Sequence, residues 1–276
     1  MNRIQLIEQI QSKQSYLCVG LDTDFTRIPA HLQQEKNAVL QFNKAIIDAT
    51  KDHCIGYKLN TAFYEVYGIK GWEILEETLA YIPTTHFTIA DAKRGDIGNT
   101  SAQYAKTFFE TYKFNAVTVA PYMGEDSIRP FLDHTDKFTI VLGLTSNKGA
   151  NDFEYLKTSD GIFFYEKVIS KIATWGTPEN LMFVVGATQT KELHNIRKII
   201  PANFLLIPGI GAQGGSLEEV SEYGMNNDCG LIVNAGRSVL FASGNEDFAE
   251  AAAGVAKAYS ADMKTYLNKQ MVKTPQ

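Results

Sequence analysis

Eight short runs of apolar and β-branched residues recur along the whole length of this 276-residue chain. Most of them are continuous rather than alternating in polarity, which is typical of strands covered on both faces in a parallel sheet. Segments with helical periodicity separate the runs, and this repeated alternation predicts an α/β fold, a (β/α)8 TIM barrel. The expected strands are residues 16–21, 55–59, 86–90, 116–120, 138–144, 181–185, 204–207 and 230–234. The expected helices include residues 34–52, 72–81, 101–113, 161–174, 190–199 and 216–223, and a closing helix over 247–267.

The main alternative is a doubly wound open sheet. A dinucleotide-binding sheet of that kind needs G-x-G-x-x-G in the turn after its first strand, but residues 21–24 read Leu-Asp-Thr-Asp. No linker rich in Pro, Gly or Ser divides the chain, so we expect one barrel domain over residues 1–276. The longest connection between strands includes the polar stretch 146–152, which is a candidate lid over a binding site.

Charge and cysteine content narrow the classes of partner. The formal net charge is −5, so there is no general basic surface for nucleic acid or an anionic membrane, and an anionic substrate needs a local site. Cys18, Cys54 and Cys229 lie far apart in apolar runs and are typical of buried thiols rather than of disulfides or a metal site. The N-terminus is too polar for a signal peptide and no run approaches transmembrane length, which makes the cytoplasm the expected location.

The densest group of charged residues is Asp91-Ala92-Lys93-Arg94-Gly95-Asp96-Ile97-Gly98-Asn99-Thr100, at the end of the third run. Side chains alternate along a strand, so Asp91 and Lys93 point to the same side, and Asp96 follows in a loop before a helix that begins near Gly98. Charges about 4 Å apart interact by roughly 4 kcal/mol at an effective dielectric constant of 20. Such a group can stabilise one distribution of charge and penalise another. A solvated ion pair with little energetic effect is the structural alternative.

Chemically active residue types gather where the expected strands end, which is where barrels of this class carry their active sites. These positions hold Asp22, Lys58, Asp91, Lys93, Ser146 and two glycine-rich turns, 208–211 and 234–237. Taken singly, Lys58 could be a snorkelling side chain and Asp22 a helix N-cap. Their shared location with Asp91 and Lys93 favours a network in which ammonium and carboxylate groups alternate.

The two glycine-rich turns follow the seventh and eighth strands. Residues 208–215 read Pro-Gly-Ile-Gly-Ala-Gln-Gly-Gly, which lets backbone N–H groups approach an anion closely ahead of a helix. Gly236 and Arg237 add another amide and a guanidinium, the favoured bidentate partner of phosphate. Glycines that only serve tight turns are the alternative. The loops after strands seven and eight are the usual phosphate site of such barrels, which favours phosphate binding here.

Together these residues closely resemble the orotidine 5'-phosphate decarboxylase family. The resemblance runs from strand one to strand eight and rests on Asp91-x-Lys93-x-x-Asp96-Ile97-x-x-Thr100, Asp22, Lys58, the turn 208–214 and Gly236-Arg237. The longer motif and the chain length indicate the subgroup of roughly 270 residues. The resemblance implies decarboxylation of orotidine 5'-phosphate to uridine 5'-phosphate, the last step of UMP biosynthesis, with neither a cofactor nor a metal.

The resemblance also implies roles for individual residues. Lys93 would stabilise and protonate the C6 carbanion, and Asp91 would face the departing carboxylate. Lys58 and Asp96 would keep Lys93 charged and in position. The implied binding residues are Asp22 and Thr100 for the ribose, Ser146 for the pyrimidine, and Gln213, Gly236 and Arg237 for the phosphate. A homodimer is implied as well, in which Asp96 and Thr100 reach into the partner's site.

Two other interpretations stay open. Related phosphosugar decarboxylases, aldolases and epimerases share the barrel and the Asp-x-Lys-x-x-Asp pattern, whose carboxylates there help to bind a divalent metal. A chelator would abolish such an activity and spare orotidylate decarboxylation. A non-catalytic barrel would bind a phosphorylated ligand without turnover, and it leaves the group of charges unexplained, because buried charges without a function are costly.

Overall fold

The eight predicted strands form a closed barrel in the computed structural model, which describes residues 1–211 and 214–273. Every strand is parallel to both of its neighbours, the order around the barrel follows the sequence, and β8 closes on β1. The strands are β1 (Leu17–Gly20), β2 (Gly56–Asn60), β3 (Phe87–Arg94), β4 (Ala116–Val119), β5 (Phe138–Leu144), β6 (Leu181–Val185), β7 (Leu205–Pro208) and β8 (Leu231–Ala235). The prediction of a (β/α)8 barrel is confirmed.

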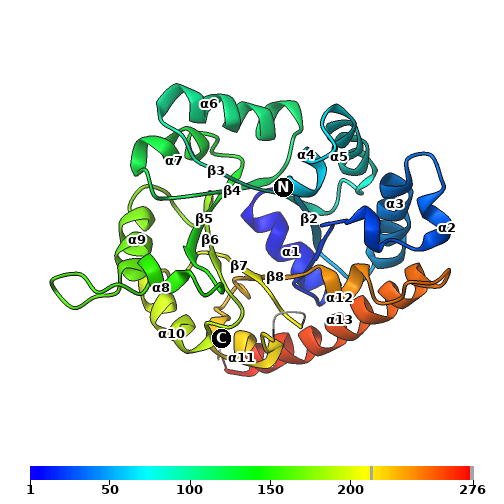
Figure 1. The fold of residues 1–276 in the computed structure, drawn as a ribbon. Helices are drawn as coiled ribbons and strands as arrows, with labels where there is room; N and C mark the ends of the chain where they lie inside the picture. Colours follow the sequence, from blue (N-terminus) through cyan, green and yellow to red (C-terminus); the bar gives the residue numbers. More distant parts are fainter. Residues whose placement is uncertain (212–213, 274–276) are drawn as a thin grey trace.

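Helices surround the strands in a ring, with the barrel at the centre of the view in Figure 1. The larger helices of the ring are α3 (Ala38–Thr50), α5 (Ile69–Tyr81), α6 (Gly98–Lys106), α7 (Glu125–Leu132), α9 (Phe164–Ala173), α10 (Thr190–Ile199), α11 (Leu217–Gly224) and α13 (Phe248–Lys273). Shorter helical turns are η1 (Phe25–Arg27), α2 (Ala30–Gln33), α4 (Ala62–Glu65), the π-helical η2 (Thr107–Thr111), α8 (Ala150–Phe153) and α12 (Arg237–Leu240). Helices thus cover the apolar strands on the outside of the barrel. On the inside, the side chains of the strands cover one another.

Some helix boundaries differ from those predicted. The helix expected over 34–52 begins only after Asn37, whose φ of 63° is left-handed and interrupts the helix. The helix expected over 161–174 begins three residues later, because a turn at Gly161, with a φ of 80°, leads into an extended Phe163 that pairs with Lys157. The last helix continues to Lys273 instead of ending at residue 267. Turn residues with unusual backbone conformations, which periodicity does not register, decide two of these boundaries.

The helix α1 (Arg3–Lys13) closes the N-terminal end of the barrel. Its own residues Leu6 and Ile10 are fully buried. Arg3 donates to the backbone oxygen of Ala202, in the loop before β7, and to the carboxylate of Asp228, in the loop before β8. Both distances are 2.8 Å. The helix therefore covers the end of the barrel opposite to the C-terminal ends of the strands.

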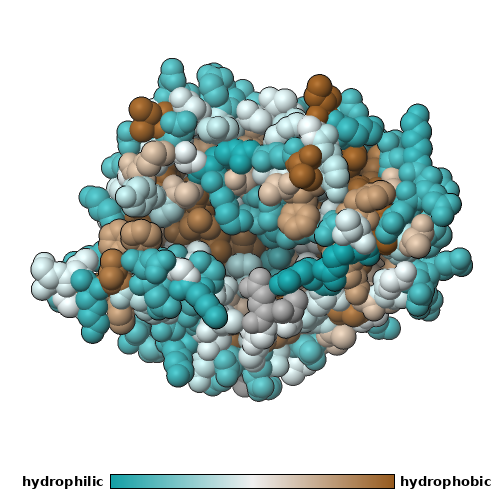
Figure 2. All heavy atoms as spheres, in the orientation of Figure 1, coloured by the Kyte–Doolittle hydropathy of each residue, from teal (hydrophilic) through white to brown (hydrophobic). Residues whose placement is uncertain are grey.

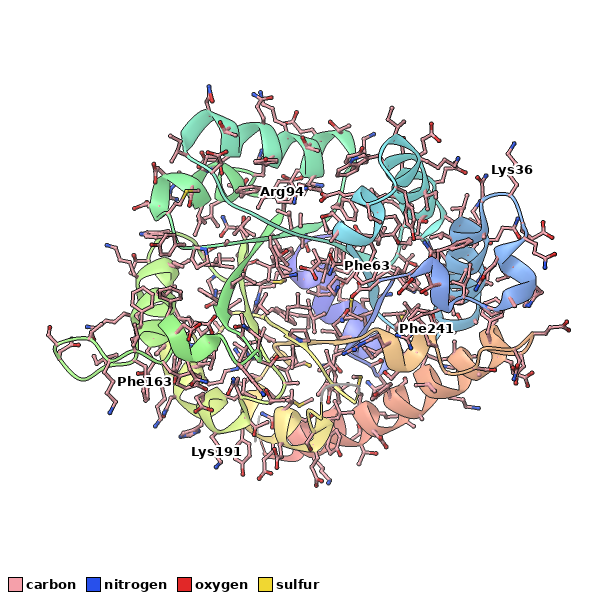
Figure 3. The ribbon with its side chains drawn as sticks, viewed as in Figure 1. Lys36, Phe63, Arg94, Phe163, Lys191 and Phe241 are labelled. Carbon is pink, nitrogen blue, oxygen red and sulfur yellow. The ribbon has the colours of Figure 1, made fainter. Side chains whose placement is uncertain are left out.

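Aromatic side chains join the last helices of the ring to the early ones. Phe42 of α3 stacks on Phe248 of α13 with 5.1 Å between ring centroids, and on Phe241, which follows α12, at 6.1 Å. The guanidinium of Arg27 lies 3.9 Å from the centroid of Phe241. Figure 3 labels Phe241 at this junction. These contacts anchor the segment after β8 that contributes to the cavity.

The three cysteines are buried and free, as predicted. Burial raises the pKa of the Cys54 thiol to about 11 and that of Cys229 to about 12. The helices of residues 1–211 and 214–273 include none with the length and apolarity needed to cross a membrane.

Candidate active site

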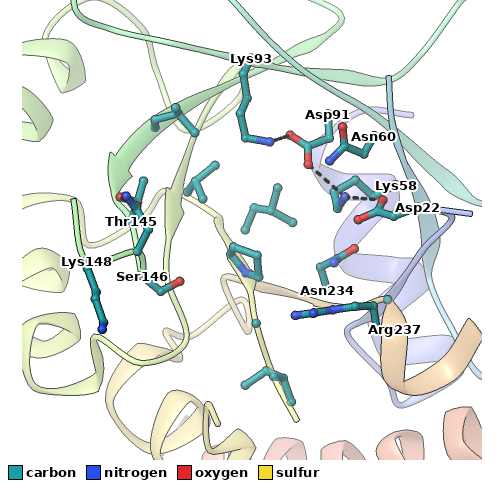
Figure 4. A pocket seen from close by; sticks show the side chains of 18 residues that line it. Asp22, Lys58, Asn60, Asp91, Lys93, Thr145, Ser146, Lys148, Asn234 and Arg237 are labelled. Carbon is teal, nitrogen blue, oxygen red and sulfur yellow. Dashed lines mark hydrogen bonds and ion pairs between the residues drawn. The ribbon is translucent and has the colours of Figure 1, made fainter. Parts of the chain in front are cut away.

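A cavity of about 620 Å³ opens at the C-terminal ends of the strands. Figure 2 shows this end of the barrel hollowed near its centre, and Figure 4 shows the cavity from close by. Polar lining residues are Asp22, Lys58, Asn60, Asp91, Lys93, Thr145, Ser146, Asn147, Lys148, Asn234 and Arg237. Leu142, Val184, Leu206, Pro208 and Ile210 are the apolar ones. The charged residues Asp22, Lys58, Asp91 and Lys93 lie on or just after β1 to β3, across the barrel from the apolar residues of β5 to β7. The cavity therefore has a charged wall that faces an apolar wall.

Four charged side chains alternate in sign along the charged wall. Lys58 Nζ donates to Asp22 Oδ1 at 3.1 Å and to Asp91 Oδ2 at 3.0 Å. Lys93 Nζ donates to Asp91 Oδ1 at 2.5 Å (Figure 4). The side chain of Lys58 is 3% exposed, whereas that of Lys93 is 48% exposed and lines the cavity. Lys58 is therefore an internal partner of two carboxylates rather than a snorkelling residue, and Lys93 is the ammonium that a ligand can reach.

Burial and charge act in opposite directions on the pKa values of this network. Burial alone would lower the pKa of Lys58, but the negative charges and hydrogen bonds of Asp22 and Asp91 outweigh it and raise that pKa. Burial alone would raise the pKa of Asp91, but Lys58 and Lys93 outweigh it and hold that pKa well below its usual range. Both side chains are consequently charged throughout the neutral pH range.

The segment after β5 brings Ser146 to the cavity and is held in place from two directions. Glu154 accepts a hydrogen bond from Thr145 N at 2.7 Å and another from Thr145 Oγ1 at 2.8 Å. From the other side, Gln189 Nε2 donates to Thr145 O at 2.9 Å. Gly186 approaches so closely that a Cβ there would lie 2.6 Å from Ser146 Oγ. The backbone at residues 145 and 146 is thus fixed by groups that do not line the cavity.

The two glycine-rich turns meet beside the cavity. Gly209 and Gly211 have φ values of 96° and 72°, which glycine adopts without strain. Gly236 and Arg237 line the cavity from the end of β8 and the start of α12, and Figure 4 shows the Arg237 side chain extending into it. Gln213 lies outside the described residues. The described parts of both turns thus lie where a phosphate site was predicted.

Asp96 and Thr100 do not line the cavity of their own chain. Asp96 follows β3, and its Oδ1 accepts a hydrogen bond from Ile97 N at 2.7 Å. Thr100 is exposed in the first turn of α6, which begins at Gly98 as predicted. A single chain brings together Asp22, Lys58, Asp91, Lys93, Ser146, Gly236 and Arg237, and it leaves these two residues outside.

Asn60 and Thr145 are polar cavity residues that were missed in the sequence, whereas Asn234 was noted there as the first residue of the turn 234–237. Asn60 ends β2, two residues after Lys58 and therefore on the same side of the strand, so alternation could have identified it. Asn234 of β8 is 7% exposed, and its buried Oδ1 has no hydrogen-bond partner among the described residues. That oxygen is an acceptor available to a ligand in the cavity. Sequence analysis placed Asn234 at a strand end with chemically active residues, but it predicted no separate role for this side chain.

Residues 1–211 and 214–273 contain no group of three His, Cys, Asp or Glu side chains arranged to hold a metal ion. The two carboxylates that line the cavity, Asp22 and Asp91, both accept hydrogen bonds from the ammonium of Lys58.

Comparison with known proteins agrees with this geometry. The model of the orotidine 5'-phosphate decarboxylase / HUMPS family matches residues 15–252. The chain is 56% identical over 267 residues to orotidine 5'-phosphate decarboxylase of Phocaeicola vulgatus, covering 96% of this chain and 98% of that protein. It is 57% identical over 255 residues to the protein of the same name from Flavobacterium johnsoniae, covering 91% and 93%. The solved structure of Leishmania donovani OMP decarboxylase is similar with a TM-score of 0.81 at 33% identity, covering 96% of this chain and 99% of that one.

The family model spans all the charged residues of the cavity, and the similarity to these relatives extends over nearly the whole of each chain. This chain therefore belongs to the orotidine 5'-phosphate decarboxylase / HUMPS family.

Proposed function

We propose that this protein is an enzyme of UMP biosynthesis that converts orotidine 5'-phosphate to uridine 5'-phosphate and CO2. The observation that carries the proposal is the alternation of Asp22, Lys58, Asp91 and Lys93, with the Lys93 ammonium reaching the cavity. The relatives that bear the name of this activity align over nearly the whole chain. In this proposal residues 1–276 form one barrel domain, and two such chains supply the residues of each site.

The reaction requires an electron pair to be stabilised on carbon. The bond between C6 of the pyrimidine and its carboxylate carbon breaks, CO2 leaves, and the pair stays on C6 in the plane of the ring. No neighbouring π system accepts it, so the fixed charges of the protein have to stabilise it without a cofactor or a metal. Lys93 is suited to this task, because its ammonium can lie beside the carbanion and then donate a proton to C6.

Asp91 faces the substrate carboxylate in this mechanism. Two lysines keep Asp91 ionised, so it repels the bound carboxylate, and the repulsion disappears when CO2 leaves. Lys58 holds Asp91 from the interior, and Asp96 of the partner subunit would hold the charge and position of Lys93 from the outside. Asp91, Lys58 and the partner's Asp96 thus all act on the placement of the Lys93 ammonium group.

The remaining predicted binding residues would contact three different parts of the substrate. The phosphate would be bound by Gln213, Gly236 and Arg237, the ribose by Asp22 and Thr100, and the pyrimidine by Ser146. The apolar wall would contact the pyrimidine ring. Since the phosphate is remote from C6, its binding energy can drive closure of the 146–152 segment over the substrate.

The proposed enzyme is a homodimer in which Asp96 and Thr100 complete the partner's site. Support comes from apolar side chains that are exposed on the same end of the barrel as these residues. Ile97 is 61% exposed, Tyr122 88% and Met123 44%. Asp96 and Thr100 lie outside the cavity of their own chain. Exposed apolar groups next to such residues are typical of a surface that another protein covers.

We also propose a cytoplasmic enzyme without a nucleic-acid or membrane partner. The three buried thiols fit a reducing compartment, and the net charge of −5 does not favour binding to polyanions.

The ultraviolet absorbance of orotidine 5'-phosphate, followed with enzyme in EDTA, tests the proposal. Wild type should convert the substrate, Lys93→Ala should be almost silent, and Lys191→Ala, on the outer face of α10 (Figure 3), should match wild type. No conversion, together with phosphosugar turnover that EDTA abolishes, would identify a metal-dependent relative. Nucleotide binding without any turnover would identify a non-catalytic barrel.

A further inference from the structure

The strand that carries Asp91 and Lys93 is irregular where these residues lie. Ala90 and Arg94 of β3 pair with Val117 and Val119 of β4, so the three residues between Ala90 and Arg94 lie opposite Thr118 alone. A bulge of this kind removes regular ladder hydrogen bonds and redirects side chains. The backbone groups and side chains in the bulge therefore need other partners.

Lys93 has a φ of 47°, in the left-handed region that non-glycine residues rarely adopt. Its backbone N–H donates to Thr118 Oγ1 at 2.9 Å. A residue keeps such a conformation only where its surroundings enforce it. The hydroxyl of Thr118 replaces the carbonyl that a regular ladder would have offered to this N–H.

The same hydroxyl donates to Asp91 Oδ1 at 3.0 Å, and that oxygen also accepts the ammonium of Lys93. A hydroxyl has one hydrogen and two lone pairs, so it can make both contacts at once. Thr118 is only 1% exposed and does not line the cavity. It touches Asp91 and Lys93 from behind, where water does not compete.

We infer that Thr118 is a positioning residue for the decarboxylation: its hydroxyl ties the backbone of Lys93 to the carboxylate of Asp91, so that both charged groups present one geometry to the substrate. The inference rests on the proposed function for its kinetic consequences. The dependence of the Lys93 backbone conformation on the Thr118 hydroxyl does not involve the substrate and can be tested without it.

Thr139 offers a matched control on the adjacent strand β5. It is fully buried, and its Oγ1 has no hydrogen-bond partner among the described residues. Valine has nearly the shape of threonine without the hydroxyl. Thr118→Val removes two hydrogen bonds, whereas Thr139→Val removes none, and both changes place a β-branched apolar residue in a buried strand.

We expect Thr118→Val to lower kcat by about 10- to 100-fold, the usual effect of losing a hydrogen bond to a charged group that is used in the transition state. KM should change by less than about threefold, since the variant keeps every side chain that lines the cavity. Thr118→Ser keeps the hydroxyl and should restore kcat to within about threefold of wild type, and Thr139→Val should match wild type.

A kcat of Thr118→Val equal to that of wild type overturns the inference. So does a Thr118→Ser variant as slow as Thr118→Val, because the methyl group would then be the part that matters. A crystal structure of Thr118→Val, or of Thr118→Ala if the first variant does not fold, gives a second readout. Lys93 should leave the left-handed region or its ammonium should move away from Asp91, and an unchanged site contradicts the inference even if wild type fails to act on orotidine 5'-phosphate.

Discussion

The buried ammonium of Lys58 lies 3.0 Å from Oδ2 of Asp91, and the Lys58 side chain is only 3% exposed. Charges this far from water are costly unless each keeps its partner. The contact that satisfies Lys58 also keeps the neighbouring carboxylate ionised. One ion pair therefore contributes both to the stability of the barrel and to the charge of the cavity.

Lys58→Met should lower the free energy of unfolding by about 3 kcal/mol at pH 7, because it leaves a buried carboxylate with one partner fewer. The folded-state pKa of Asp91 is lowered, so its contribution to stability is present above about pH 3.9 and is lost as the pH falls towards the folded value. The folded-state pKa of Lys58 is raised, so its contribution is present below about pH 10.4 and is lost as the pH rises towards the folded value. Urea unfolding should thus show the largest difference from wild type between about pH 4 and 10.

Lys70→Met is the control for that prediction. Lys70 pairs with Glu73 at 3.1 Å on the exposed face of α5. Its removal should change the free energy of unfolding by less than about 1 kcal/mol at every pH. A Lys58→Met difference that is constant from acid to alkaline pH would contradict the coupling of the two pKa values.

Arg237→Ala should raise KM for orotidine 5'-phosphate by about 100-fold or more, which corresponds to about 2.7 kcal/mol of lost binding. The reason is the loss of a bidentate guanidinium contact to phosphate at the edge of the cavity. Slow turnover of orotidine, which lacks the phosphate, should be the same in wild type and variant. An equal loss with both substrates would mean that Arg237 contacts another part of the nucleotide.

Lys93→Ala and Asp96→Asn should complement each other when they are expressed together. Each homodimer alone lacks one group in both sites. In a mixed dimer, one site combines an intact Lys93 with an intact Asp96 from the other subunit. Random pairing makes half of the dimers mixed, so about a quarter of the wild-type specific activity should appear. Absence of any recovery in an isolated mixed dimer would show that Asp96 acts within its own chain.

Glu154→Ala should raise KM about tenfold, with a smaller effect on kcat, because the two hydrogen bonds that hold Thr145 beside Ser146 are lost. Glu154→Gln keeps one carbonyl acceptor and should lose less. Asp152→Ala, an exposed change in the same segment, should match wild type. Steady-state kinetics with orotidine 5'-phosphate check all three variants, and equal effects of the alanine changes at 152 and 154 would point to the mobility of the segment instead.

Apolar runs predicted the barrel strands to within one residue, with β3 as the exception. Parallel strands covered on both faces must be apolar, so the pattern ends where burial ends. Strand β3 continues to Arg94 through four residues that include two charged side chains of the cavity and a bulge against β4. A hydrophobicity pattern therefore does not detect the part of a strand that carries charged residues of the cavity.

Site residues were predictable where several chemical types met at strand ends, as with Asp22, Lys58, Asp91 and Lys93. Asn60 and Thr118 are single polar residues in apolar surroundings, and only their contacts reveal them. The sequence by itself determined the strand order, the end of the barrel that carries the chemistry and the family pattern, because these follow from periodicity and from residue types at strand ends. Only the tertiary structure decided the bulge, the left-handed Lys93 and the shared hydroxyl of Thr118, because these depend on distances between neighbouring strands that no local pattern encodes.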